Sequence, residues 1–204
     1  MRKGLLITIE GGDGSGKSTQ LAFIKKYLQE KKIDALITRE PGGTSVGEKT
    51  RNLVLDPQNT EMAHLTEALL FAAARAQHVA EVIGPAIEKG EIVICDRYID
   101  SSLVYQGEAR GMGKPVYEMN KIAIGEYEPD ATILLNITPQ IVRERIEPAK
   151  RDRLEAEPDE FHRKVFDAYK ELAKRFPERI IEIDASLPRE EVSAQIEKHL
   201  EKLL

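Results

Sequence analysis

The sequence, 204 residues long, predicts an α/β fold: a doubly wound, parallel five-stranded sheet with helices on both faces. Two observations predict this fold. Short apolar segments alternate along the chain with longer segments whose apolar residues recur at helical spacing, as βαβ units require. A glycine-rich loop also stands between the first apolar segment and the first helical one. No internal repeat or low-complexity linker divides the chain, so we expect one domain over residues 1–204.

Five short segments are predicted to be strands. The first, at residues 5–9, is apolar and β-rich and ends at a run of glycines. Those at 92–95 and 131–135 are continuously apolar, which is typical of strands buried on both faces of a parallel sheet. The other two lie at 35–38 and 180–183. Because such sheets bind ligands at the carboxyl ends of their strands, we expect functional motifs directly after the strands.

Helices are predicted where apolar residues recur every three or four positions. The first follows the glycine-rich loop, and a short one spans residues 47–55. Residues 61–89 are rich in Ala, Leu and Glu and predict one long helix with a break near Gly84 and Pro85, because proline lacks an N–H. A short helix after Pro139 and two amphipathic helices nearer the C-terminus complete the pattern.

Composition excludes several classes of function. Lys and Arg total 30 against 35 Asp and Glu, a formal net charge of −5, which argues against nucleic acid or an anionic membrane as a partner. One cysteine cannot form an intramolecular disulfide, and the four histidines lack metal-ligand spacing. No apolar run approaches the roughly 20 residues of a membrane span, or the length of a signal peptide core. We therefore expect a cytoplasmic protein.

The glycine-rich loop matches the phosphate-binding pattern G-x-x-x-x-G-K-[ST]. Glycines let successive backbone N–H groups surround a phosphate, and the following helix N-terminus adds positive potential. Lys17 is expected to reach the β- and γ-phosphates of a nucleotide, and the Ser18 hydroxyl to ligate Mg²⁺. The predicted ATP-binding set in this loop is Gly11, Gly12, Asp13, Gly14, Ser15, Gly16, Lys17, Ser18 and Thr19.

The loop alone does not separate a kinase from a switch GTPase or a mechanical ATPase, and an ordinary strand-to-helix turn is the plainest alternative. A GTPase is disfavoured because the sequence has no Asn-Lys-x-Asp to select guanine, and no Asp-x-x-Gly follows the third strand. The rest of the chain therefore has to decide between the remaining classes.

A second anion site is predicted after the strand at 92–95. Asp96 can hold Mg²⁺ beside the phosphate loop, and Arg97 can bind a second phosphate. In isolation a strand-end salt bridge would be the favoured explanation of this pair, but the phosphate loop reverses that preference. Arg39 and Arg51 come from two further segments that the fold would direct toward the same cleft. A kinase with a phosphorylated acceptor needs such a site, because it must bring two anions together.

A charged segment at about residues 143–158 has two interpretations. It carries several basic residues mixed with acids and is interrupted by Pro148. It is either a solvated surface loop or a lid that closes over the phosphates and supplies arginines to the transition state. The residues alone leave both interpretations open.

The sequence resembles thymidylate kinases over essentially its whole length. The resemblance rests on Glu-Gly-Gly-Asp-Gly-Ser-Gly-Lys-Ser-Thr at 10–19, Arg-Glu-Pro-Gly-Gly-Thr at 39–44 and Asp-Arg-Tyr-Ile-Asp-Ser-Ser-Leu-Val-Tyr-Gln-Gly at 96–107. It implies a nucleoside monophosphate kinase fold of the P-loop type, a homodimer and Mg²⁺ as cofactor. The implied reaction transfers the γ-phosphoryl group of ATP to dTMP, giving ADP and dTDP in dTTP biosynthesis.

The resemblance also implies roles for individual residues. Phe71 would stack on thymine, and Arg75, one helical turn later, would hydrogen-bond an exocyclic oxygen. Ser102 and Gln106 would meet the polar edge of the base, and Tyr105 would crowd the 2′ position and disfavour ribonucleotides. Arg39, Arg51 and Arg97 would hold the acceptor phosphate, and Asp13 would lie near it, the sugar and Mg²⁺.

Thymidylate kinases divide over the position of the catalytic arginine. One group has a basic residue after the aspartate of the phosphate loop, where this chain has Gly14. The resemblance therefore implies the group whose lid supplies the arginine, and it favours the lid interpretation of residues 143–158. Arg151 and Arg153 are then the best candidates for catalysis beside Lys17 and Arg97, with Arg145 near the adenine or the phosphates of ATP.

Two other functions remain open from the sequence. The chain could phosphorylate another pyrimidine nucleotide, or it could be an ATP-binding regulatory module without transfer activity. The second would be expected to have lost acceptor-site residues such as Phe71, Arg75 and Gln106, which are all present. We also expect the acidic protein to carry one basic cleft sized for two nucleotides.

Overall fold

A computed structural model of the protein describes residues 4–145 and 152–204. Its five strands form one sheet in the order β2-β3-β1-β4-β5, and each neighbouring pair is parallel. The doubly wound, five-stranded fold predicted from the sequence is confirmed. The strands are β1 (Leu5–Glu10), β2 (Ala35–Arg39), β3 (Ile92–Asp96), β4 (Ala131–Asn136) and β5 (Ile180–Asp184).

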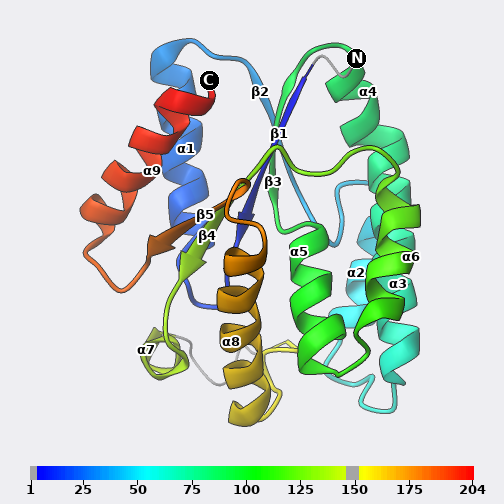
Figure 1. The fold of residues 1–204 in the computed structure, drawn as a ribbon. Helices are drawn as coiled ribbons and strands as arrows, with labels where there is room; N and C mark the ends of the chain where they lie inside the picture. Colours follow the sequence, from blue (N-terminus) through cyan, green and yellow to red (C-terminus); the bar gives the residue numbers. More distant parts are fainter. Residues whose placement is uncertain (1–3, 146–151) are drawn as a thin grey trace.

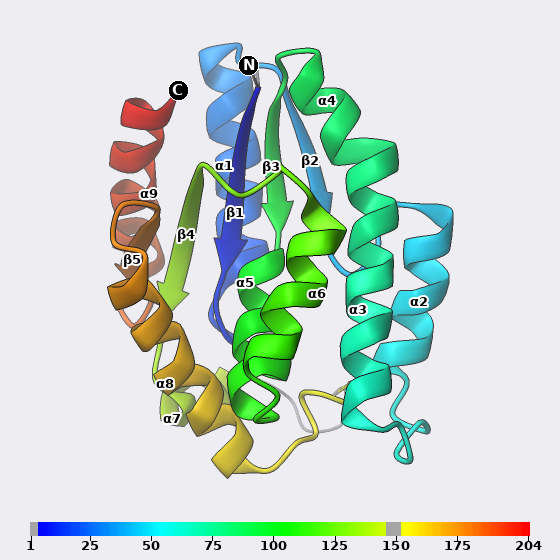
Figure 2. The ribbon, with the colours of Figure 1, turned by 45° about the vertical axis from the view of Figure 1, so that its right-hand side comes forward.

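Helices cover both faces of the sheet (Figures 1 and 2). On one face, α1 and α9 pack against the side chains of Ile7 and Ile9, while Leu6 points to the opposite face and packs with Val79 and Ile83. The helical segments are α1 (Lys17–Lys31), α2 (Ser45–Leu55), α3 (His64–His78), η1 (Val79–Ile83), α4 (Gly84–Glu88), α5 (Ile99–Ser102), η2 (Leu103–Ala109), α6 (Lys114–Ile124), α7 (Pro139–Arg145), α8 (Asp159–Arg175) and α9 (Arg189–Leu203).

The central strand shows why the apolar segments form this sheet. Leu6, Ile7 and Ile9 of β1 have no exposed side-chain area, and burial of a side chain of this size contributes roughly 1.5–3 kcal/mol. Ile7 pairs with Ile94 on one side and with Ala131 on the other. A strand buried on both faces and paired on both edges is expected to be mostly apolar, and the two polar members of β1, Thr8 and Glu10, are buried with hydrogen-bond partners.

The expected break in the long helix has a different form. The backbone remains helical through Gly84 and Pro85 as far as Glu88, but it widens into the π-helical turn η1. The Gly84 N–H donates to the carbonyl of Val79, five residues earlier. Because a proline ring clashes with the carbonyl four residues before it, the wider turn lets the helix continue where a regular one would end.

All three helical segments between β3 and β4 are absent from the sequence prediction: α5, η2 and the regular helix α6. α5 has four residues and η2 is a π-helix, so neither shows the 3.6-residue apolar period by which helices were assigned. α5 and η2 follow β3 in the chain and lie at the carboxyl edge of the sheet. None of the described helices is long and apolar enough to cross a membrane.

Candidate active site

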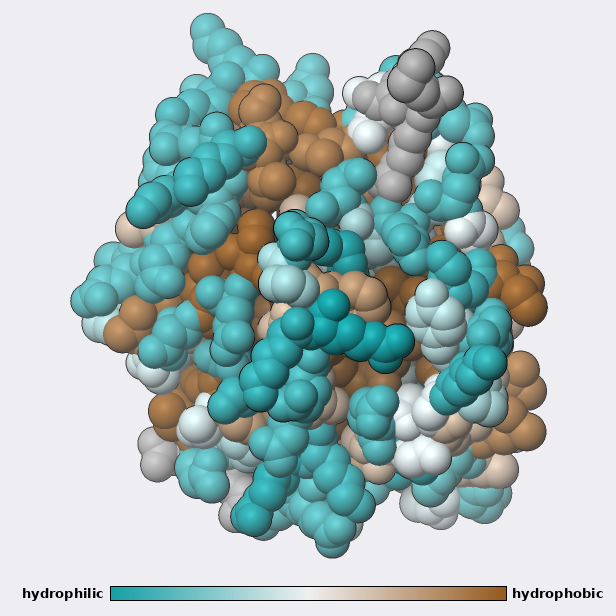
Figure 3. Space-filling model, viewed as in Figure 1, coloured by the Kyte–Doolittle hydropathy of each residue, from teal (hydrophilic) through white to brown (hydrophobic). Residues whose placement is uncertain are grey.

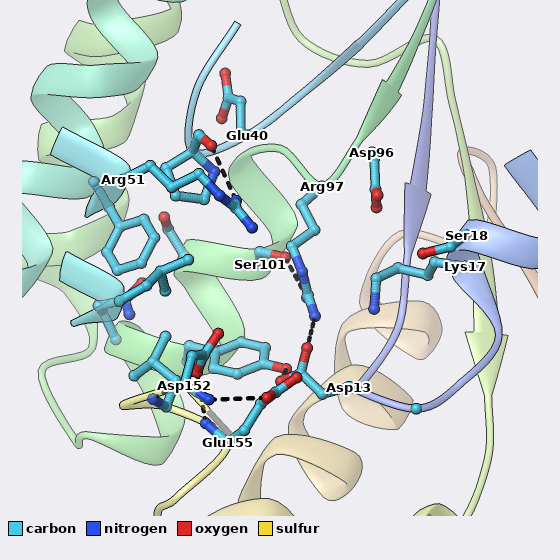
Figure 4. Close-up of a pocket in the computed structure, with 18 of the residues that line it drawn as sticks. Asp13, Lys17, Ser18, Glu40, Arg51, Asp96, Arg97, Ser101, Asp152 and Glu155 are labelled. Atoms are coloured by element: carbon cyan, nitrogen blue, oxygen red, sulfur yellow. Dashed lines mark hydrogen bonds and ion pairs between the residues drawn. The ribbon is translucent and has the colours of Figure 1, made fainter. Parts of the chain in front are cut away.

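A cavity of about 560 Å³ lies at the carboxyl ends of β1 and β3. Its walls come from the phosphate loop, the turn after β2, helices α2 and α3, the segment from β3 through η2, and residues 152–155. Figure 4 shows side chains from these separate segments converging on it. Motifs that follow different strands therefore meet at one edge of the sheet, as the parallel topology predicts.

The phosphate loop has the backbone geometry that its glycines permit. Gly11 adopts φ 142°, and a Cβ atom there would lie 2.6 Å from the carbonyl oxygen of Leu135. Gly16 begins α1 without any side-chain cap, so the first N–H groups of the helix remain available to an anion. Of the predicted loop residues, Asp13, Gly14, Gly16, Lys17, Ser18 and Thr19 line the cavity.

Lys17 lies at the base of this loop. Its Nζ donates to the carbonyl oxygens of Gly11, at 3.0 Å, and Gly12, at 2.9 Å. Burial, together with the nearby charge of Arg97, lowers the pKa of Lys17 to about 8. The ammonium group is thus held in the loop by two neutral acceptors, which a phosphate could replace with a charged one.

Two oxygen groups beside Lys17 fit a magnesium ion. The Oδ1 atom of Asp96 is buried and has no hydrogen-bond partner among the described residues. Ser18 lies next to it at the cavity wall (Figure 4). A carboxylate and a hydroxyl are the hard ligands that Mg²⁺ takes in combination with phosphate oxygens and water. The residues present therefore fit the expected cofactor.

Arg97 stands at the centre of the cavity and connects its two ends (Figure 4). It adopts φ 64°, a left-handed backbone conformation, which costs a non-glycine residue of order 1 kcal/mol and is often found at functional sites. Its guanidinium donates to the Gly11 carbonyl and the Ser101 hydroxyl, both at 3.1 Å, and forms an ion pair with Asp13.

Asp13 is ionised in this environment. Burial alone would raise its pKa, but the charges of Arg97 and Lys17 outweigh burial and hold the pKa below its ordinary value. The Tyr105 hydroxyl also donates to Asp13 Oδ2 at 3.1 Å. Asp13 therefore links the phosphate loop to the opposite wall of the cavity, and Arg97 lies over the ring of Tyr105.

The far end of the cavity combines an aromatic ring with a fixed guanidinium. Phe71 and Arg75 lie one turn apart on α3 and both line the cavity. Arg75 is 2% exposed, and Ser102 accepts one of its N–H groups at 2.7 Å. It also donates to Glu40 Oε2 at 2.7 Å, to Asn120 Oδ1, and to the carbonyl oxygen of Tyr98 at 2.8 Å.

These contacts use four of the five donors of Arg75. A guanidinium has one N–H on Nε and two on each Nη, so one Nη2 hydrogen has no acceptor among the described residues. Arg75 also lines the cavity, so a ligand bound there could supply the fifth acceptor. Gln106 borders the same space and donates from Nε2 to Glu67.

The three arginines expected to hold an acceptor phosphate occupy different positions. Arg97 and Arg51 line the cavity, whereas Arg39 does not. Arg39 donates through one nitrogen to both carboxylate oxygens of Glu48 and lies half exposed. Arg51 donates to the Pro41 carbonyl at 3.1 Å. The structure thus brings two of the three together, and places Arg39 behind the turn at residues 40–44.

The expected lid arginines are only partly described. Arg145 ends α7, and its side chain, like the whole of Arg151, lies outside what the structure describes. Arg153 forms an ion pair with Glu67 at 2.7 Å and donates to the carbonyl of Val54 at 2.8 Å. Its guanidinium does not line the cavity, whereas its neighbours Asp152, Leu154 and Glu155 do.

The expectation of a basic cleft is wrong for the residues that the structure describes. The lining holds four basic side chains, from Lys17 and three arginines, and five acidic ones. Three of the acidic residues have an assignable role: Asp13 and Glu40 form ion pairs with arginines, and Asp96 fits a cation. Burial and the proximity of Asp13 raise the pKa of Asp152 and Glu155. Because carboxylates hold the arginines in place, positive and negative charges are nearly equal in number in the cavity. A count of the arginines alone does not reveal this balance.

Several residues that support the site were missed in the sequence. Glu40 is buried and accepts from both Arg75 and His78. Glu10, at the end of β1, accepts from Ser101 and from the hydroxyl of Tyr169, and burial followed by the charge of Asp100 raises its pKa. The available signal was a carboxylate directly after or within an apolar strand, because a buried acid must be paired.

Comparisons with known proteins find similar sequences and a similar structure. The family model for thymidylate kinase matches residues 9–196. The chain is 48% identical over 196 residues to the thymidylate kinase of Geobacillus sp. (strain WCH70), covering 94% of this chain and 93% of that protein. It is 45% identical over 203 residues to that of Symbiobacterium thermophilum, covering 98% and 94%.

A solved structure is also similar. The crystal structure of thymidylate kinase from Ehrlichia chaffeensis matches with a TM-score of 0.78 at 32% identity, covering 97% of this chain and 98% of that one. These comparisons span nearly the full length of both partners, so the likeness includes the whole cavity and is not confined to the phosphate loop.

Proposed function

The chain belongs to the thymidylate kinase family, and we infer that the cavity described above is where the γ-phosphoryl group of ATP passes to dTMP. The activity is that of an ATP-dependent phosphotransferase, and its products are ADP and dTDP. One observation carries the assignment of the site: a single cavity joins the phosphate loop to the pocket formed by Phe71 and Arg75. A nucleotide at each end would place two phosphate groups on either side of Arg97.

The phosphate loop is the proposed donor site. Phosphate oxygens of ATP would replace the carbonyls of Gly11 and Gly12 as acceptors for Lys17, and they would accept the free N–H groups at the start of α1. Asp96 and Ser18 would hold Mg²⁺, which when bound neutralises charge developing on the phosphates. The donor is thus fixed in position before the acceptor phosphate approaches it.

The opposite end is the proposed acceptor site. Phe71 supplies a flat face for the base, and the remaining Nη2 hydrogen of Arg75 can be donated to an exocyclic oxygen of thymine. Tyr105 lies between these groups and the phosphate loop, since its hydroxyl bonds Asp13. This position supports contact with the sugar and, as proposed for the family, crowding of a 2′-hydroxyl. Ser102 would have two roles: it would contact the base, and it would align Arg75 by accepting a hydrogen bond from it.

Arg97 and Arg51 would hold the acceptor phosphate. The backbone of Arg97 and its contacts with Gly11 and Ser101 fix the guanidinium before substrate binds. No side chain has to remove a proton, because the phosphate oxygen that attacks is already anionic. Catalysis then consists of positioning two anions in line and compensating their charge. Arg39 would act on this site through the turn at residues 40–44.

We place the lid arginine at Arg151. Arg153 is held by Glu67, whereas Asp152 and Glu155, on either side of it, face the cavity. Arg151 lies outside the described residues, and we propose it as the arginine that meets the transferred group because Arg153 is already paired. Arg145 remains the proposed contact to the adenine or the phosphates of ATP.

We also propose a homodimer built on α2, α3 and α6. These helices carry exposed apolar side chains that no described residue covers, and Ile122 of α6 is 83% exposed. Figure 3 shows apolar surface at the right-hand edge of the view, where these helices lie in Figure 1. Exposed apolar side chains gathered on neighbouring helices are typical of protein interfaces. The other exposed members are Val46, Leu53, Leu65 and Leu69.

Identification of the product tests the proposed site. The protein is incubated with ATP, Mg²⁺ and dTMP, and ³¹P NMR is expected to show the two phosphorus signals of dTDP appearing with those of ADP. Lys17→Met and Arg75→Met should both abolish dTDP formation, one by disabling the donor end and the other the acceptor end. Retention of dTDP formation in the Arg75 variant would contradict the acceptor site, and its retention in the Lys17 variant would contradict the donor site.

A further inference from the structure

Glu67 on α3 is a buried carboxylate that does not itself line the cavity. Its side chain has no exposed area. It accepts from Gln106 Nε2 at 2.9 Å through Oε1, and it pairs through Oε2 with Arg110 at 3.1 Å and Arg153 at 2.7 Å. Buried carboxylates with this many donors are held in one orientation.

Glu67 is ionised in this setting. Burial alone would raise its pKa, but hydrogen bonds from Gln106 and Arg110 and the charge of Arg110 outweigh burial and lower it. An ionised carboxylate can only accept hydrogen bonds. The end of the Gln106 amide that faces Glu67 must therefore be the NH₂ group, and the opposite orientation would place two oxygens against each other.

This constraint decides what Gln106 presents to a ligand. Gln106 lines the cavity beside Phe71 and Arg75, and its Oε1 atom receives no hydrogen bond from the described residues. With Nε2 committed to Glu67, the group left for the cavity is the carbonyl oxygen, an acceptor. Next to it, Arg75 offers a donor.

We propose that Glu67 is a specificity-determining positioning residue, which fixes the amide of Gln106 so that its carbonyl accepts the N3–H of a thymine or uracil base. Thymine presents a donor at N3 beside an acceptor oxygen, which matches an acceptor at Gln106 and a donor at Arg75. Cytosine presents an acceptor at N3 beside an amino group and mismatches both. This inference rests on the proposed acceptor site, and it adds the group that sets the direction of its hydrogen bonds.

Glu67→Gln tests this role, because a neutral amide can accept or donate and no longer dictates the orientation of Gln106. The ratio of kcat/KM for dTMP to that for dCMP is expected to fall about tenfold, in line with the loss of one directed hydrogen bond. The change should appear in KM for the acceptor, and KM for ATP should remain unchanged. An unchanged ratio in a folded variant would overturn the proposal.

Arg110→Gln is the matched control. It removes an ion pair from the same carboxylate, and also one to Glu157, but it leaves Glu67 facing Gln106. We expect a lower melting temperature with the preference for dTMP retained. If Arg110→Gln lost the preference as fully as Glu67→Gln, the effect would be general loosening of the network and the proposal would fail.

Gln106→Leu keeps the proposal testable if Glu67→Gln does not fold, because it leaves the ion pairs of Glu67 in place. Removal of the carbonyl is expected to lower the dTMP-to-dCMP ratio by a similar factor. Where Glu67→Gln itself folds, combining the two substitutions should lower the ratio no further. A preference that survives Gln106→Leu would overturn the inference. Wild-type protein that used dCMP as well as dTMP would instead contradict the acceptor site itself, so the two failures are distinguishable.

Discussion

Arg97 is the residue at which the two ends of the cavity meet. It touches the phosphate loop at Gly11 and Asp13 and the opposite wall of the cavity at Ser101 and Tyr105. Because the guanidinium is already fixed on both sides, it loses little conformational entropy when the phosphates bind. Such preorganisation is the condition for strong electrostatic stabilisation of a transition state.

Arg97→Ala is therefore expected to lower kcat by about 10²–10³-fold, the range observed when a preorganised charge donor is removed. Arg39→Ala serves as the control, because Arg39 pairs with Glu48 outside the cavity. Its kcat should fall by less than about tenfold, since only the turn that it supports is disturbed. Steady-state kinetics with saturating ATP measure both; equal losses in the two variants would contradict the central place of Arg97.

Lys17 gives the site a dependence on pH. Its pKa of about 8 means that the amine is largely neutral above that value in the free protein, while a bound phosphate favours the charged form. ATP binding should therefore take up a proton at a pH of about 8.5, and affinity should fall as the pH rises beyond the pKa of the free protein.

Isothermal titration in two buffers that differ in ionisation enthalpy measures this proton uptake. Lys17→Arg keeps its charge at that pH and should bind without uptake. An absence of uptake in the wild-type protein at a pH of about 8.5 would show that Lys17 is already fully charged before ATP binds.

At the scale of elements, the sequence predicted what depends on apolar period and motif. The five strands, the first helix and the phosphate loop were all foreseen because burial dictates their patterns. The π-helical segment η2 was not, although it carries Tyr105 and Gln106, because a widened turn leaves no period to detect. The resemblance named these residues, but the carboxylates that orient them, Glu40 and Glu67, required the packed structure.

Helix α2 positions Arg51, and its start depends on a side-chain cap. The Thr44 hydroxyl accepts the Gly47 N–H at 2.9 Å. Thr44→Ala should lower the free energy of unfolding by about 1 kcal/mol and raise KM for dTMP by moving Arg51.

Thr50 lies on the same helix, and its exposed hydroxyl donates to the Val46 carbonyl. Thr50→Ala should change stability by less than about 0.5 kcal/mol and leave KM unchanged. Thermal unfolding followed by circular dichroism makes the comparison, and equal effects of the two substitutions would contradict the capping role.

The two arginines proposed for the lid are expected to differ in their effects when they are substituted. Arg153 forms a buried ion pair with Glu67, so Arg153→Ala should cost about 2 kcal/mol of stability, because Glu67 keeps Arg110 but loses its second arginine partner. Arg151→Ala should leave the melting temperature unchanged and lower kcat by on the order of 10²-fold or more, as loss of an arginine finger does. A large loss of kcat with unchanged stability in the Arg153 variant would reverse the assignment.

Over the whole molecule, the net charge of −5 does not describe the cavity. Charges of both signs gather at one edge of the sheet, and each arginine deep in the cavity has a carboxylate partner, as Arg75 has Glu40 and Arg97 has Asp13. Net acidity outside the site therefore coexists with selective binding of anionic nucleotides, because local geometry and not overall charge decides the interaction at short range.

The proposed dimer makes a prediction at the same scale. Light scattering should give twice the chain mass of 22.9 kDa. Leu69→Glu should shift the protein toward the monomer, because α3 would carry a charge into the interface. Leu204→Glu is the control, since this exposed residue lies at the C-terminus away from α3, and should leave the mass unchanged. A monomeric wild-type protein would contradict the dimer.

The most direct test of the account is the acceptor specificity of the wild-type enzyme. A coupled assay of ADP release measures kcat/KM for dTMP, dUMP, UMP, CMP and AMP under one set of conditions. We predict that dTMP is the best acceptor. The kcat/KM for UMP should be lower by about 10²-fold or more, because Tyr105 crowds the 2′-hydroxyl of UMP and because uracil lacks the methyl group of thymine. Turnover of UMP equal to that of dTMP would contradict the assigned cavity.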